Sequence, residues 1–165
     1  MAFDAFVKID TIEGECTDEK HKNWIGIQSF SHGMSQQVSS SASAVGGRTT
    51  GRVDMQDFSI VKMLDKSSPK LALACCNGEH LKSVVIELCR AGKDPQKYME
   101  YKLSDVVVAN VRTGGSCQGG DSLPTEEVSF HFGKIEWTYS VINSATGKPT
   151  GNVPTMWDLN KNKGS

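Results

Sequence analysis

The chain has 165 residues, and its 18 basic and 19 acidic side chains leave a net charge of −1. That length suits one domain that buries a core without disulfides or metals, so residues 1–165 are treated as a single domain. The near-zero net charge argues against nucleic acid as a partner. No apolar run reaches the roughly 20 residues of a membrane-spanning helix, so no membrane span is expected.

Alternating apolar and polar residues predict strands over most of the chain. In the first, residues 3–9, the side chains of Phe3, Ala5, Val7 and Ile9 share one face. Further strand patterns cover residues 24–34, 52–60, 83–91, 98–112 and 127–142, with a short closing strand at 156–159. Residues 161–165 are expected to be loose. This succession predicts a mainly β fold.

The strand at residues 127–142 changes its apolar phase at Gly133. Phe130 and Phe132 share one face before the glycine, whereas Ile135 and Trp137 share the other face after it. One extra residue at Gly133 would keep both pairs inside, so the pattern predicts a β-bulge there. Bulges bend strands and help sheets to close. We therefore expect a small β-barrel of two sheets.

One short helix is expected next to this barrel. Ser67 and Ser68 supply an N-cap, Pro69 suits the first helical position, and Asn77 with Gly78 ends the helix. Its inward stripe is expected to be Leu71, Ala74 and Cys75. The adjacent pair Cys75 and Cys76 is interpreted as buried and structural, because the helix C-terminus disfavours a thiolate.

Two segments are poor in large apolar residues. Residues 39–51 (SSSASAVGGRTTG) are either a solvated loop or a contact to another subunit, and the sequence leaves both open. Residues 114–120 are rich in glycine but lack the Lys-Ser/Thr pair and the following helix of a nucleotide loop. A glycine-rich turn explains the second segment better.

No reaction is indicated by the remaining residues. The four histidines fall in no metal-ligand spacing with each other or with the five cysteines, so neither a metal nor a cofactor is predicted. The odd cysteine count fits a reduced chain. The acidic pairs Asp54 with Asp57 and Glu126 with Glu127 are interpreted as solvated surface groups, and His131 is expected to face solvent or a lumen. The protein is not expected to be an enzyme.

Several motifs, in order, resemble the Hcp family, the haemolysin-coregulated proteins that form the tube of bacterial type VI secretion systems. These motifs lie at residues 14–18, 24–25, 30–36, 53–58, 65–69, 77–80, 111–116, 127–132 and 135–139. The similarity covers most of the chain, with residues 142–154 the least family-like. One departure is His32, which stands where the family often has an aromatic residue two positions after the one matched by Phe30.

This resemblance implies a homo-hexameric ring that stacks into a tube, works with sheath and spike components, and holds effector proteins in its lumen. The protein would wait in the bacterial cytoplasm and leave without a cleaved signal peptide. Ser31, with His32 beside it, would contact effectors in the lumen. The loop toward the neighbouring ring would comprise Ser39, Ser40, Ala44, Val45, Gly46, Gly47 and Arg48.

Two other functions remain open at this point. The first is a monomeric β-barrel module that binds a ligand or carbohydrate through Trp24 or Trp157, in a pocket with convergent polar groups. The second is a small enzyme with a scattered active site, which requires strongly perturbed titratable groups in one cleft. The oligomeric state separates the ring subunit from the binding module.

Overall fold

The computed structural model describes residues 2–39, 50–118 and 123–165. Strands dominate, and Ser68–Asn77 is the one helix within these ranges, so the prediction of a mainly β fold is confirmed. The elements in chain order are β1 (Phe3–Ile9), β2 (Ile25–Ile27), β3 (Ser29–Ser31), β4 (Met34–Val38), β5 (Thr50–Met55), β6 (Phe58–Met63), α1 (Ser68–Asn77), β7 (His80–Arg90), β8 (Lys97–Gly114), β9 (Thr125–Ile142), β10 (Pro149–Asp158) and β11 (Lys163–Gly164).

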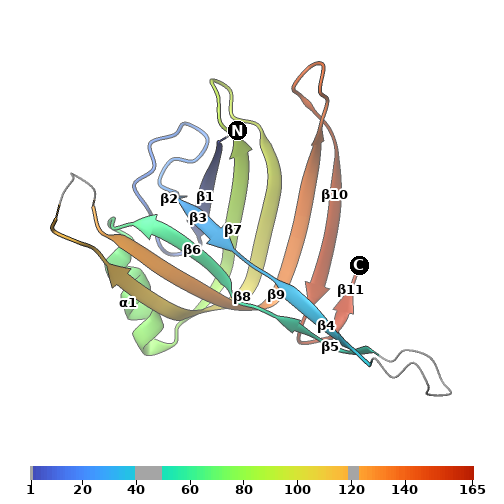
Figure 1. Cartoon of the computed structure of the whole chain (residues 1–165), viewed down its shortest axis with the longest axis horizontal. Helices are drawn as coiled ribbons and strands as arrows, with labels where there is room; N and C mark the ends of the chain where they lie inside the picture. The colour runs from blue at the N-terminus through green and yellow to red at the C-terminus, as the bar shows by residue number, and fades with distance from the viewer. Residues whose placement is uncertain (1, 40–49, 119–122) are drawn as a thin grey trace.

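The strands form one large curved sheet and one small one (Figure 1). The large sheet has nine strands, in the order β11-β10-β9-β8-β7-β1-β2, with β6 on β9 and β3 on β6. The small sheet is the pair β4–β5 alone. All these pairs are antiparallel.

The sheets are not closed into a barrel, which corrects that part of the expected fold. The reason lies at β9, which pairs with β8 along nearly its whole length. Its other edge is shared, because β6 pairs with residues 125–130 and β10 pairs with residues 134–142. The sheet therefore branches at β9 instead of continuing round to a single closing strand.

The bulge predicted at Gly133 is wrong. The pairs Leu103 with Ile135 and Val106 with Phe132 keep one register on both sides of the glycine. The irregularity between β8 and β9 lies farther along, between Val108 and Asn110. Strand β7, on the other side of β8, shows the same phase change. It buries Leu81 and then Val84, three residues later, and its pairing with β8 has no register shift between them. The change of phase thus belongs to several neighbouring strands.

Apolar alternation correctly identified much of the core. In β1, Ala5, Val7 and Ile9 are buried as expected, while Phe3 at the strand's start is exposed. Besides Val7 of β1, the largest fully buried apolar side chains come from β2, β6, α1, β7, β8 and β9. They are Ile25, Phe58, Ile60, Leu71, Leu81, Ile86, Leu103, Phe130 and Ile135.

Helix α1 begins and ends close to where the sequence predicts, and it packs against β8. Gly78 adopts the left-handed conformation (φ 65°) that terminates the helix, while Ser67 at the N-cap makes no side-chain capping bond. Leu71 and Ala74 are buried, whereas Cys75 is only half-buried and Cys76 is exposed. The prediction of two buried cysteines is therefore wrong, because Cys75 packs only partly against the core and Cys76 lies on the exposed face of the helix.

A buried ionic cluster fixes the start of α1 to β6 and β9. The Lys62 Nζ atom donates to Glu126 Oε2 at 2.9 Å, to Asp65 Oδ1 at 3.0 Å and to Ser68 Oγ at 3.0 Å. Lys62 is 0% exposed and Glu126 is 2% exposed. The interpretation of Glu126 as a solvated surface acid is wrong, because a buried carboxylate needs a paired cation and this cluster supplies one.

The C-terminal residues are ordered, contrary to expectation. Strand β11 pairs with Trp157 and Asp158 of β10, and Ser165 exchanges backbone hydrogen bonds with Met156 at 3.2 Å.

In the part of the chain that the structure describes, no helix has the length and apolar character needed to cross a bilayer.

Candidate functional site

The structure separates the two residues expected to line a lumen. Ser31, at the end of β3, is exposed. The half-buried ring of His32 packs inward, 5.4 Å from the ring of Phe58 and 5.8 Å from that of Phe132. Among the described residues neither ring nitrogen makes a hydrogen bond of ordinary geometry, although the Gln56 backbone lies close enough to affect the ring. Burial lowers the pKa of His32, an effect that the backbone of Gln56 partly opposes.

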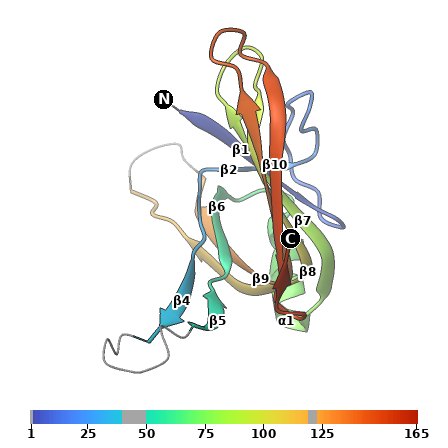
Figure 2. The same ribbon diagram turned by 90° about the vertical axis from the view of Figure 1, so that its right-hand side faces the viewer.

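The expected inter-ring loop extends from a two-stranded arm. Strands β4 and β5 pair only with each other and project away from the main sheet (Figures 1 and 2). Every residue of β4 is exposed, as is Ser39 directly after it. The remaining residues predicted for this loop lie outside the described ranges: Ser40, Ala44, Val45, Gly46, Gly47 and Arg48.

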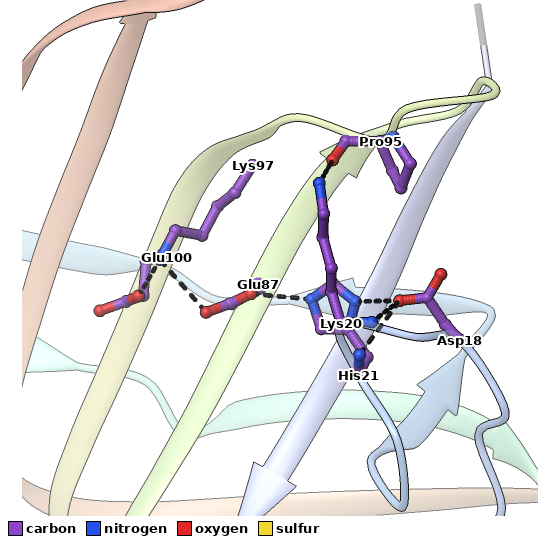
Figure 3. A network of polar contacts seen from close by, with 7 residues as sticks. All are labelled: Asp18, Lys20, His21, Glu87, Pro95, Lys97 and Glu100. Atoms are coloured by element: carbon purple, nitrogen blue, oxygen red, sulfur yellow. Dashed lines mark hydrogen bonds and ion pairs between the residues drawn. The ribbon is translucent and has the colours of Figure 1, made fainter.

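A polar cluster that sequence reasoning missed is centred on His21. Figure 3 shows its imidazole between two carboxylates, with Nδ1 at 2.7 Å from Asp18 Oδ1 and Nε2 at 2.8 Å from Glu87 Oε2. The ring is buried, stacked on Phe6 at 4.0 Å between centroids and touched edge-on by Trp24 at 4.9 Å. Each of the two ring nitrogens therefore faces a carboxylate oxygen within hydrogen-bond distance.

The cluster continues onto β7 and β8. Lys97 Nζ donates to Glu87 Oε1 at 3.2 Å and to Glu100 Oε2 at 2.6 Å, as Figure 3 shows. Cys89 lies two residues after Glu87 on β7, and its sulfur, a Glu87 oxygen and a His21 nitrogen all lie within 4.8 Å of one another. Burial, and next the Glu87 carboxylate, raise the pKa of the Cys89 thiol to about 11.

An open groove of about 430 Å³ runs beside the cluster. Its lining includes the three groups His21, Glu87 and Cys89, together with Trp24 and Lys97. Charged side chains of the cluster therefore line a groove that is open to small solutes from the solvent.

Sequence spacing failed to reveal this cluster for a physical reason. His21 lies 66 residues from Glu87, and only the pairing of β1 with β2 and β7 brings the loop after β1 against β7. Two local signals existed: Asp18 and His21 are three apart in a polar loop, and Glu87 and Cys89 share one face of a strand. Neither signal alone has a ligand spacing.

Comparison with known proteins reveals one consistent relationship. The family model described as "Type VI secretion system effector, Hcp" matches residues 6–139. The chain is 36% identical to Protein hcp1 of Pseudomonas aeruginosa over 163 residues, which covers 98% of each chain. This chain belongs to the Hcp family. The resemblance noted in the sequence motifs is thereby confirmed.

Solved structures agree with this Hcp assignment. A structure described as a type six secretion system protein is 31% identical, covers 99% of this chain and 100% of its own, and superposes with a TM-score of 0.93. Hcp1 from Salmonella typhimurium is 27% identical, with 99% and 100% coverage and a TM-score of 0.80. Membership of the Hcp family makes the protein a component of type VI secretion.

The other histidines of this Hcp chain do not build a catalytic arrangement among the described residues. His131 is exposed, as expected, and its Nδ1 lies 2.8 Å from Asp57 Oδ1. His80 is likewise exposed and lies 3.1 Å from Asp105. Both pairs are solvent-accessible, an arrangement typical of surface ion pairs.

Proposed function

We propose that this protein is a ring-forming subunit of the type VI secretion inner tube, that its hexameric rings stack, and that the lumen carries effector proteins during export. Membership of the Hcp family supports a role in type VI secretion. The observation that carries the proposal is the β4–β5 arm, which projects from the body and exposes all of β4. Spike and sheath components are then further partners of the assembled tube.

The arm is best explained by a partner. A two-stranded ribbon is marginal by itself in water and gains stability by packing against something else. Its base is held near Trp137 and Trp157, which line one pocket with residues of both arm strands. Exposed apolar surface lies at both ends of β4, with Met34 at the base and Val38 at the far end. A neighbouring ring that receives the arm would bury this surface.

Ring closure needs two different patches on one subunit, because a cyclic head-to-tail contact joins unlike surfaces. One is a tip patch near the β9–β10 connection, formed by the exposed Tyr139, Val141 and Val153, with Val153 directly opposite Tyr139. The other is an edge patch at the opposite ends of β6 and β9, formed by the exposed Met63 and Leu123. Figure 1 places these two ends of the curved sheet far apart.

Analytical ultracentrifugation with negative-stain imaging tests ring formation. We expect a discrete ring species with a central hole. Val153→Asp should shift the population to monomer, because a carboxylate would be buried in the contact. The matched control is Leu73→Asp, since Leu73 (60% exposed) is as accessible as Val153 (57% exposed) but lies on α1. A monomer at high concentration for the unmodified chain would contradict the proposal and favour a ligand-binding module.

Ser31 is proposed as a contact for effectors in the lumen. Ser31 is exposed and ends β3, next to His32, whose ring stacks on the buried Phe58. Ser31→Glu is expected to reduce co-purification of effector proteins without changing ring size, and Ser144→Glu in an exposed turn is the control. Equal loss in both variants would contradict a specific contact at Ser31.

A further inference from the structure

We propose that His21, Glu87 and Cys89 form a binding site for one divalent zinc-like metal ion. Their donor atoms already lie within 4.8 Å of one another. In a tetrahedral zinc site, metal–ligand bonds of about 2.0–2.3 Å place neighbouring donors roughly 3–4 Å apart. Only small movements are therefore needed to bring the three donors round one ion.

The chemistry of the donors selects the class of metal. One imidazole nitrogen, one thiolate and one carboxylate suit Zn²⁺ and its spectroscopic substitute Co²⁺. Magnesium and calcium prefer all-oxygen sites, and a thiolate does not match that preference. With three protein ligands, a fourth position remains for water or another ligand. The adjoining groove provides the entry path to that position.

The orientation of His21 supports the site independently of its ligand atoms. Asp18 holds Nδ1 at 2.7 Å and leaves Nε2 facing Glu87 Oε2 at 2.8 Å, and the Cys89 sulfur lies in the same cluster. A carboxylate on the far nitrogen of a ligating histidine is the usual outer partner in zinc sites, where it fixes the ring and raises its basicity. In Figure 3, Asp18 and Glu87 lie on opposite sides of the ring.

Proton balance defines what the metal replaces. Zinc binds the Cys89 sulfur as a thiolate, so binding of Zn²⁺ releases the thiol proton to solvent. Glu87 Oε2 exchanges its contact with His21 for a bond to the metal. The other carboxylate oxygen, Oε1, keeps the hydrogen bond that it accepts from Lys97 Nζ. The thiolate and carboxylate then balance the dication, and no oxidant or reductant takes part.

Cobalt titration of the metal-stripped, reduced, full chain tests the site. We expect one Co²⁺ per chain, with a thiolate charge-transfer band, intense visible absorption of a four-coordinate ion, and displacement of both by Zn²⁺. Cys89→Ser should abolish the charge-transfer band because serine removes the sulfur with little change in volume. Cys76→Ser is the matched control, since that thiol is exposed on α1 and is not one of the three proposed ligands.

Two further measurements guard against misfolded variants and stray thiol binding. Zinc should raise the Tm of the unmodified chain and of Cys76→Ser, but not that of Cys89→Ser, because a ligand bound only by the folded state stabilises it. Zinc addition in weak buffer should release at least the Cys89 thiol proton, one per bound ion. A band that persists in Cys89→Ser, or no band in a chain whose circular dichroism is native, would overturn the proposal and leave the cluster as an ion-pair network.

Discussion

At the scale of single residues, the least expected feature is a lysine in the core. Lys62 is fully buried and donates to two carboxylates, a hydroxyl and the Met63 carbonyl. Its alternating position on β6 predicts that it faces the same side as the core residues Phe58 and Ile60. Burying an ammonium group is tolerated because each proton has an acceptor.

Replacing one partner of this cluster should be more harmful than replacing both. Lys62→Met leaves the buried Glu126 carboxylate uncompensated, so we expect a loss of about 3–5 kcal/mol in the free energy of unfolding. The double variant Lys62→Met with Glu126→Leu should recover most of it. Urea denaturation at fixed protein concentration measures both. A single variant as stable as the double would contradict an ionic role.

Gly14 is predicted to tolerate no side chain. A Cβ atom there would collide with the Trp24 carbonyl oxygen and lie 2.8 Å from Ile25 Cα, both of which are backbone atoms that cannot move aside cheaply. Gly14→Ala should cost about 1–3 kcal/mol, as other overpacked sites do. The control is Gly26→Ala, because nothing lies within 4 Å of that added carbon. Equal melting temperatures for the two variants would refute this.

His32 should make stability depend on pH. Burial lowers the pKa of His32 from the ordinary value of 6.5, so the unfolded chain binds a proton more readily than the folded chain. This contribution to stability is complete above about pH 6.5 and is lost as the pH falls through that value toward the lowered folded pKa. His32→Phe keeps a ring against Phe58 and should reduce the loss.

Urea denaturation between about pH 8 and pH 5 measures this contribution as the difference between the two proteins. Carboxylates common to both contribute equally and cancel. The same pH slope in both would show that His32 does not titrate differently on folding.

At the scale of elements, α1 is held by one face only. Leu71 is fully buried and Leu73, two residues later, is 60% exposed. Leu71→Ala should therefore cost about 2–5 kcal/mol through lost burial and the cavity left behind. Leu73→Ala should change the free energy of unfolding by no more than about 0.5 kcal/mol. Thermal denaturation of the two variants measures the contrast, and similar losses would mean that α1 does not pack as described.

The long strands show where periodicity succeeds and where it fails. The pattern predicted β7, β8 and β9 to within a few residues, because each is half-buried and alternates. It also wrongly predicted a bulge at Gly133. The apolar pattern of β9 changes face there, but the neighbouring strands change face at the same level of the sheet, which the sequence of one strand cannot reveal. It missed the break between β2 and β3 at Gln28, whose N–H donates to Val61 of β6 at 2.7 Å.

At the scale of the whole molecule, the proposed ring rests on two unlike patches at separate ends of the sheet. Val153→Asp damages the tip patch and Met63→Asp damages the edge patch, so each variant alone should remain monomeric. In a mixture of the two variants, the intact edge patch of Val153→Asp can still bind the intact tip patch of Met63→Asp. Sedimentation should then show heterodimers but no rings, because the second contact needed for closure is missing. Rings in the mixture, or in either variant alone, would contradict this arrangement.

The sequence by itself determined the family, the mainly β character, the position of α1 and most core positions, because alternation, capping residues and ordered motifs are local properties. The tertiary structure alone decided the branching at β9, the burial of Glu126 against Lys62 and the meeting of His21 with Glu87 and Cys89. These depend on which strands pair and on contacts between residues more than 60 positions apart. Local patterns carry no information about such contacts, whose geometry arises only when the chain packs.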